Sequence, residues 1–173
     1  MKLEQENNLI AKIYDAALLP ALWLEVIEDI VSYTKSKSAI FTGLDQLNPG
    51  YDFVHTYNIP NESLAAYQDE RIRVIDMKLH MPLWNAIEMG DALSHNCQHY
   101  AEQPGTDHYV FYEKCLKPSG VSYLAGVLLD RGNYRWAVLG IHRAPEVQPF
   151  EQVKLDFLRR ISIHLRRALQ IHR

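Results

Sequence analysis

The stretch HNCQHY, from His95 to Tyr100, holds the densest group of side chains that could do chemistry. Histidine and cysteine are the usual ligands of zinc and of haem iron. His95, Cys97 and His99 would nevertheless wrap poorly around one ion, because they lie within a single short stretch and no fourth ligand is suitably spaced. The sequence therefore leaves a metal at this stretch as an open alternative, and we expect neither a metal site nor a cofactor.

Nucleophilic catalysis has no recognisable motif in the chain. Neither Cys97 nor Cys115 lies in an evident electropositive setting with a partner histidine that the sequence identifies. The chain also lacks a glycine-rich phosphate loop, a nucleophile elbow and a metal-hydrolase helix. We therefore expect a protein that is not an enzyme.

Two hairpins and several helices must position whatever site the chain has. Apolar alternation bounded by turn residues predicts strands at 38–44, 52–58, 121–130 and 134–142, with a further short strand near 92–94. Helical periodicity predicts helices on either side of Pro20 up to Thr34, from Asn61 through Ile72, around 79–87 with a break near Pro82, from Thr106, and after Pro149.

The second hairpin is apolar on both faces. Tyr123, Ala125 and Val127 point one way, and Leu124 and Leu128 point the other. A sheet that is apolar on both faces must be covered on both. We expect helices from the two ends of the chain on one face and segment 61–118 on the other. The predicted fold class is α+β, a PAS/GAF-like α/β/α sandwich with a central antiparallel sheet.

Length and composition suit one ordinary globular domain. The chain has 173 residues, of which 47% are hydrophobic and 23% charged. No stretch approaches the roughly 20 apolar residues of a membrane span, and the N-terminus lacks the features of a signal peptide. We therefore expect a cytoplasmic protein with no membrane partner. The segment from Pro149 onward contains six Lys or Arg and only two Asp or Glu. This excess of positive charge indicates either a nucleic-acid-binding face or the solvated side of a helix.

Several stretches together resemble one family. LIAKIYDAALLPALWLEVIEDI (9–30) resembles the opening helix of the N-terminal sensor domain of LuxR-family transcriptional regulators, whose other half is a helix-turn-helix. FYEKCLKPSG (111–120) resembles the segment before the second hairpin of that domain, and LGIHR (139–143) the end of its last strand. RRISIHLRRALQIHR (159–173) is similar to its closing helix, with Ile163 where proline is usual.

The resemblance implies a single sensor domain over residues 1–173. Its parts would be N-terminal helices at 6–34, a sheet and pocket core at 38–143, and a C-terminal output helix at 149–172. The DNA-binding domain would be absent from this sequence, so we expect no nucleic-acid binding by the domain itself.

The resemblance also suggests a ligand site. In the acyl-homoserine-lactone receptors of the same superfamily, a tyrosine and an aspartate nine residues later hold the polar head of the signal, and Tyr67 and Asp76 have that spacing. A carboxylate can accept from an amide N–H, and a phenol can donate to a carbonyl. Ser63 and Met77 stand where those receptors have tryptophan and usually proline, so the ligand implied is a small molecule of unknown identity. In the alternative, Tyr67 packs in the helical layer and Asp76 caps the next helix.

The predicted pocket lies between the sheet and segment 61–118. Arg71 follows Tyr67 by one helical turn and would favour a ligand with a carboxylate or a carbonyl. The ligand-binding residues that we expect are Tyr57, Tyr67, Arg71, Asp76, Trp84, Tyr109 and Tyr123.

These features predict a signal-sensing regulatory domain of a LuxR-type regulator, with quorum sensing as one setting, that passes a change through its C-terminal helix. The alternative is a ligand-free homodimeric interaction module, and a small enzyme comes third. We predict a homodimer through the first and last helices, because a terminal helix of about 22 residues is about 33 Å long and would overhang the sheet. Its exposed residues would be Leu165, Ala168, Leu169 and Ile171.

Overall fold

The computed structural model describes residues 1–172 as a five-stranded sheet with helices on both faces. In chain order the elements are α1 (Leu3–Leu18), η1 (Pro20–Leu22), α2 (Trp23–Thr34), β1 (Ser38–Asp45), η2 (Pro49–Tyr51), β2 (Phe53–Tyr57), α3 (Asn61–Ala66), α4 (Glu70–Asn85), β3 (Ala92–Asn96), η3 (Gln98–Glu102), α5 (Asp107–Phe111), the π-helical turn η4 (Tyr112–Leu116), α6 (Lys117–Ser119), β4 (Tyr123–Arg131), β5 (Arg135–Arg143) and α7 (Gln152–His172).

The sheet is antiparallel throughout, with the strand order β2-β1-β5-β4-β3. The four strands of the two hairpins lie where alternation predicts them, and the further short strand is present as β3, with the bounds Ala92–Asn96. The two hairpins meet where β1 pairs with β5 over the whole length of β1, from Ser38 opposite His142 to Asp45 opposite Arg135. The predicted α+β sandwich is therefore confirmed.

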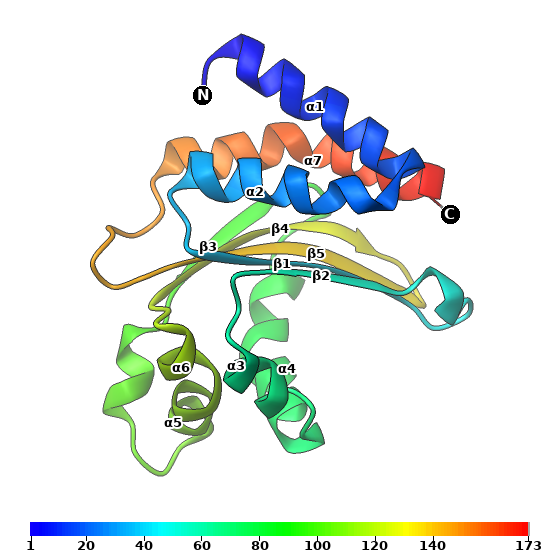
Figure 1. Cartoon of the computed structure of the whole chain (residues 1–173). Helices are drawn as coiled ribbons and strands as arrows, with labels where there is room; N and C mark the ends of the chain where they lie inside the picture. Colours follow the sequence, from blue (N-terminus) through cyan, green and yellow to red (C-terminus); the bar gives the residue numbers. More distant parts are fainter. Residues whose placement is uncertain (173) are drawn as a thin grey trace.

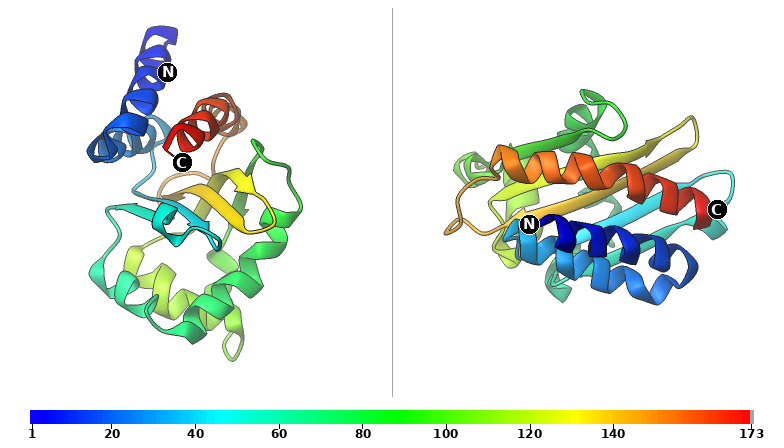
Figure 2. Two further views of the ribbon diagram at one scale, coloured as in Figure 1. Left: turned by 90° about the vertical axis from the view of Figure 1, so that its right-hand side faces the viewer. Right: turned by 90° about the horizontal axis from the view of Figure 1, so that it is seen from above.

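Helices from both ends of the chain cover one face of the sheet, which we call the first face. Helices α2 and α7 lie on the strands, and α1 lies on these two helices (Figure 1, and Figure 2 from two further sides). Alternation supplies the strand side chains of this core, which are Ala39, Phe41, Ala92, Tyr123, Ala125, Val127, Leu129, Ala137, Leu139 and Ile141. The predicted grouping of Tyr123 with Ala125 and Val127 is confirmed.

The segment between the hairpins covers the opposite, second face. Helices α3 to α6 pack mainly on one another, around a separate apolar cluster. That cluster contains Ile72, Cys97, Tyr100, Phe111, Cys115, Leu116 and Val121. From the second face of the sheet, Leu124 packs against it. The two-layer arrangement predicted from the sequence is thus present, but the second layer is attached more loosely than the first.

The helices of the second layer differ from the prediction in their boundaries. The chain turns between α3 and α4 instead of continuing as one helix from Asn61, because the Asp69 carboxylate accepts from the backbone N–H of Arg71 and begins a new helix. Helix α4 then runs through Pro82 to Asn85, where the sequence suggested a break. The predicted start at Thr106 is confirmed, since its hydroxyl accepts from the N–H of Tyr109 at 3.3 Å.

Helix α7 lies against α1 and the sheet instead of overhanging them. Leu165, Ala168 and Leu169 are buried within the chain, so the prediction that they are exposed is wrong, whereas Ile171 is 54% exposed. Val153, near the start of α7, is 55% exposed. Among the described residues, no helix has the length and apolar character that crossing a membrane would require.

Candidate functional site

Two glycines form a patch without side chains on the second face of the sheet. Gly126 of β4 pairs directly with Gly140 of β5, and we call this pair the glycine floor. A Cβ atom on Gly126 would lie 2.7 Å from Cη2 of Trp84, so only glycine lets this indole lie against the backbone of the sheet. Trp84 in turn meets Trp136 edge to face, with ring centroids 6.0 Å apart. Helix α4 therefore reaches the sheet through an aromatic pair resting on glycine.

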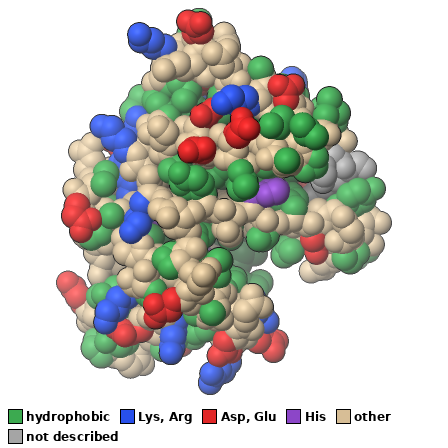
Figure 3. Space-filling view, viewed as in Figure 1, with side chains coloured by type: hydrophobic (Ala, Val, Ile, Leu, Met, Phe, Trp, Pro, Cys, Tyr) green, Lys and Arg blue, Asp and Glu red, His purple; other side chains and the backbone are tan. Residues whose placement is uncertain are grey.

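Beside this aromatic pair the second face is only partly covered. Leu44 and Val54 are apolar residues of β1 and β2 that remain 51% and 63% exposed, and Leu44 pairs with Trp136 across the strands. Met77 lies on the same side of α4 as Trp84, because seven residues make about two helical turns, and it is 58% exposed. The space-filling view shows the molecule hollowed below the β1–β2 hairpin (Figure 3). We call this concave region of the second face, below the β1–β2 hairpin, the hollow.

A chain of polar groups begins one turn before Trp84 on α4. Nδ1 of His80 lies 2.5 Å from Oδ1 of Asp76, and Nε2 of His80 lies 3.1 Å from the hydroxyl of Tyr100. The same hydroxyl lies 3.0 Å from Nε2 of His95 on β3. One tautomer set satisfies every contact: His95 donates to Tyr100, Tyr100 donates to His80, and His80 donates to Asp76. We call these four residues the polar chain.

Burial sets the protonation of several groups in and around the polar chain. It raises the pKa of Tyr100, which keeps the phenol protonated and able to donate. Burial also lowers the pKa of His95, and the neighbouring His80, His99 and His108 lower it further. The polar chain is therefore a network of hydrogen bonds in which the His95 ring is neutral at pH 7.

The two cysteines lie in the apolar cluster of the second layer. Burial raises the pKa of the Cys97 thiol to about 12 and that of Cys115 to about 11. A nucleophilic cysteine needs the opposite shift, so both thiols are inert at pH 7. Among the described residues, no three His, Cys, Asp or Glu side chains are placed to hold a metal ion.

Three of the predicted ligand-binding residues lie around the second layer. Trp84 covers the glycine floor, and Asp76 begins the polar chain instead of capping a helix. Tyr67 follows the last residue of α3 and is 37% exposed, while its backbone carbonyl accepts from Arg73. Their role in ligand binding remains a prediction.

The other four predicted site residues do not converge on the same place. Tyr57 and Tyr123 belong to the core of the first face, because strand alternation turns them away from the second layer. Placing them in a pocket on the second face is therefore wrong. Arg71 forms an ion pair with Asp69 at 2.9 Å, and its side chain is 87% exposed. Tyr109 lies near Glu113, whose negative charge raises the pKa of this tyrosine.

Sequence reasoning missed most of the residues that shape the second face. Asp76 and His80 are one helical turn apart, a spacing that could have indicated their contact. Glycines in the middle of two strong strands, Gly126 and Gly140, could have indicated close approach of another group. The contacts of Tyr100 with His80 and His95 had no such signal, because they depend on how η3 folds back beneath β3.

The fold recurs in solved structures of bacterial regulators. The N-acylhomoserine lactone dependent LuxR-family transcription factor CepR2 from Burkholderia cenocepacia matches with a TM-score of 0.62 at 14% identity, over 96% of this chain and 94% of that one. The LBD domain of VqsR from Pseudomonas aeruginosa gives 0.62 at 8% identity, over the same shares of the two chains.

A third match covers part of a longer protein. SdiA in complex with octanoyl-rac-glycerol gives a TM-score of 0.52 at 18% identity, over 91% of this chain and 59% of SdiA. Neither a protein-family model nor a curated protein matches the sequence. The structural matches establish that this chain has the fold of the ligand-binding domains of LuxR-family regulators, with five antiparallel strands between two helical layers.

Proposed function

We propose that this chain is a signal-sensing regulatory domain of the LuxR type and that it binds a small molecule in the hollow. The observation that carries the proposal is the exposed apolar surface of the second face, where Leu44 and Val54 stay exposed on the sheet and Leu44 pairs with Trp136 of the Trp84–Trp136 pair. Soluble proteins rarely leave such surfaces uncovered without a use for them. Apolar walls with a few polar groups nearby are typical of ligand sites.

The chemistry of the hollow favours an apolar chain that ends in a polar head. Leu44, Val54 and Met77 offer apolar contacts, and Trp84 and Trp136 offer flat aromatic surfaces. For the head, Tyr67 can donate to a carbonyl and Asp76 can accept from an N–H or O–H. Octanoyl-rac-glycerol, which is bound to SdiA, and the N-acylhomoserine lactones on which CepR2 depends both have this form, which supports the same class of ligand here.

In this proposal α7 carries the signal out of the domain. The Nε of Arg166 donates to the backbone carbonyl of Leu129 on β4, so the helix is attached to the strand that contains Gly126. A ligand that shifts Trp84 would also displace β4, because Trp84 lies directly against Gly126 of this strand. We further propose a homodimer through the outer faces of α1 and α7, which would bring two output helices together.

A ligand-free interaction module remains the second candidate, because Trp84 already covers the glycine floor. In that case the aromatic pair fills the site permanently, and the exposed residues of the hollow bind another protein. The two candidates differ in whether a small molecule alone stabilises the domain.

Thermal unfolding with octanoyl-rac-glycerol and with N-octanoyl homoserine lactone tests the proposal. At about 100 times Kd a ligand adds about 2.7 kcal/mol, which raises Tm by about 5–10 °C in a chain of this size. Met77→Glu should abolish the shift, because it places a charge on the apolar wall of the hollow. Leu24→Glu is the matched control, since Leu24 is 51% exposed on the other helical layer, and it should keep the shift.

Either of two results would contradict this sensor function. The first is that neither acyl compound raises Tm at its solubility limit. The second is that Met77→Glu and Leu24→Glu respond to the compounds equally well.

A further inference from the structure

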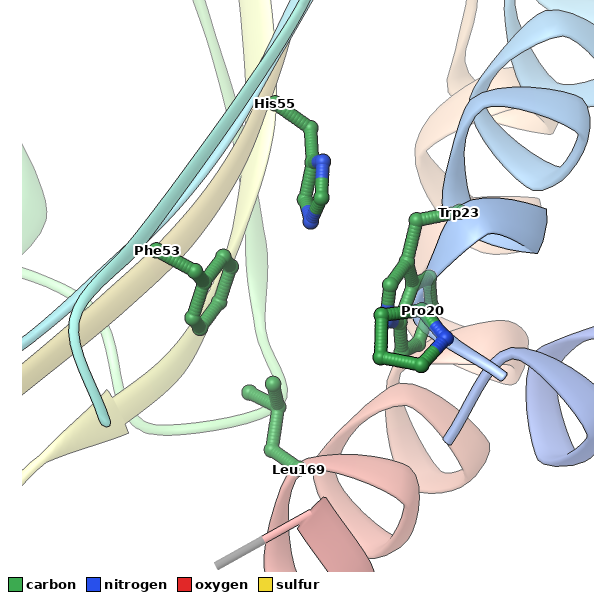
Figure 4. Close-up of a pocket in the computed structure, with 5 residues that line it drawn as sticks. All are labelled: Pro20, Trp23, Phe53, His55 and Leu169. Carbon is green, nitrogen blue, oxygen red and sulfur yellow. The ribbon is translucent and has the colours of Figure 1, made fainter. Parts of the chain in front are cut away.

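A separate cavity of about 140 Å³ lies on the first face of the sheet, on the side opposite the hollow. Its walls are Pro20 of η1, Trp23 of α2, Phe53 and His55 of β2, and Leu169 of α7. In the close-up, Phe53 and His55 extend from the strand toward Trp23 and Pro20, and Leu169 borders the space between them (Figure 4). Three distant parts of the sequence therefore border one partly open cavity.

Glycine on the neighbouring strand keeps this cavity open. Gly43 of β1 pairs with Phe53 of β2, and a Cβ atom on Gly43 would lie only 2.4 Å from Cε1 of Phe53. Because that atom is missing, the phenyl ring lies across β1 instead of standing up into the cavity.

The aromatic walls are held in place by a buried ring beneath them. Phe41 is 1% exposed and contacts Trp23 and Phe53 edge to face, with centroids 4.9 and 4.8 Å away. The imidazole of His55 lies 6.1 Å from Phe41 and 5.8 Å from Phe53. The shape of the cavity is thus fixed before anything enters it, which limits the ordering cost of binding.

Size and lining define the class of molecule that fits. An apolar protein cavity of about 150 Å³ accepts one benzene molecule. Among the five lining residues, His55 and the indole N–H of Trp23 are the polar side-chain groups, and the aromatic rings favour a flat guest. We propose that this cavity is a second ligand site, for a molecule of one aromatic ring with a single hydrogen-bonding substituent. The proposal does not depend on ligand binding in the hollow.

Occupancy of this cavity would act on the last turns of α7. Leu169 is buried near the end of this helix, and a guest would join it to α2 and to the edge strand β2. A guest in the cavity would contact all three elements, so its binding should stabilise them together.

The experiment is an NMR titration of ¹⁵N-labelled protein with phenol. It follows the indole N–H signals of the three tryptophans. The signal of Trp23 should shift saturably, while those of Trp84 and Trp136 on the second face stay in place. At about ten times Kd, Tm should rise by about 3–6 °C. Leu169→Phe fills the cavity and should remove both effects, whereas Gln170→Phe, at the exposed next position of α7, should keep them.

Several outcomes would overturn the proposal. One is a Trp23 signal that does not move at millimolar phenol, a result that stands even if Leu169→Phe fails to fold. Another is movement of Trp84 and Trp136 without Trp23, which would place phenol in the hollow. A third is unchanged binding by a folded Leu169→Phe protein. The Met77→Glu protein should still bind phenol, so failure of this proposal and failure of the sensor function are distinguishable.

Discussion

Arg143 is a buried charge that joins three elements of the domain. Its side chain is fully buried at the end of β5, and Nε donates to the carbonyl of Thr34 at the end of α2 at 3.0 Å. Nη1 donates to the carbonyls of Gln148 and Pro149, at 3.0 and 3.1 Å, and to the carboxylate of Glu151. The guanidinium also lies over the ring of Phe150, 4.3 Å from its centroid. A planar group with five donors is required to satisfy so many acceptors at once.

Arg143→Met should destabilise the domain strongly. The change leaves the carbonyls of Thr34 and Gln148 and the Glu151 carboxylate without their donor, a loss of about 3–5 kcal/mol for a broken buried pair. Tm should fall by roughly 10 °C. Arg167→Met is the control, because Arg167 is exposed on α7 and its loss should change the free energy of unfolding by no more than about 0.5 kcal/mol. Equal melting temperatures for the two variants would contradict this role of Arg143.

A second prediction at the residue scale concerns pH. Burial lowers the pKa of His142 to about 4 from 6.5, and burial together with nearby histidines lowers that of His95. Both rings are then neutral in the folded protein, and the unfolded chain binds their protons first on acidification. Their contribution to stability is complete above pH 6.5 and is lost as the pH falls toward the lowered pKa values.

Urea unfolding at pH 7.5 and at pH 5.5 measures this loss. The free energy of unfolding should fall by about 1 kcal/mol over this range through His142 alone. His142→Gln should flatten the slope, since glutamine keeps a partner for Ser38, whose hydroxyl lies 2.8 Å from Nδ1 of His142, without titrating. A slope that is identical in the wild type and in His142→Gln would exclude this histidine as its source.

At the scale of elements, the sequence predicted the strands because hairpin alternation and turn residues are local signals. The sequence also assigned Tyr123 and Leu124 correctly to opposite faces of the sheet. It did not show which helical layer each face would meet, since that depends on how segments far apart in the chain dock. Tyr57 and Tyr123 were therefore assigned to the wrong layer, although their strands were correct.

The second layer was predicted less well because its boundaries depend on single contacts. The turn before α4 is set by the Asp69 side chain, and the continuation through Pro82 is held by packing at the end of the helix, where Trp84 meets the sheet. Neither effect is a periodic pattern. Trp84 and Asp76 were predicted to bind a ligand, and that role stays a prediction. The hollow and the cavity on the first face had no sequence signal, because they arise from contacts between layers.

At the scale of the whole molecule, α7 connects the two proposed ligand sites. Leu169 borders the cavity on the first face, and Arg166 is hydrogen-bonded to β4, the strand whose second face contributes Gly126 beneath Trp84. The start of α7 is fixed through Arg143 and Glu151. A helix that is fixed at its start, borders the cavity and is hydrogen-bonded to the strand beneath Trp84 is suited to combine two signals at its far end.

The homodimer is the prediction that belongs to this scale. Because Leu165, Ala168 and Leu169 are buried, its interface must use other residues of α1 and α7 than those predicted from the sequence. Arg160 of α7 pairs with Glu6 of α1 at 2.8 Å, so the two helices present one joint surface to solvent. The exposed apolar residues on that surface are Val153, Ile163 and Ile171 of α7 and Leu3 of α1. Leu165 is 1% exposed within the chain, so Leu165→Asp would unfold the domain and would not report on association.

Ile163→Glu is therefore the informative change. Ile163 is 52% exposed at the middle of α7, and two copies related by a two-fold axis would bring this position close to itself. Sedimentation at tens of micromolar, an order of magnitude suited to a modest interface, should give a dimer for the wild type and a monomer for Ile163→Glu. Leu24→Glu, which also adds a charge at a half-exposed leucine but lies on α2, should remain dimeric. A monomeric wild type at this concentration would refute the dimer, and an unchanged mass for folded Ile163→Glu would exclude this surface.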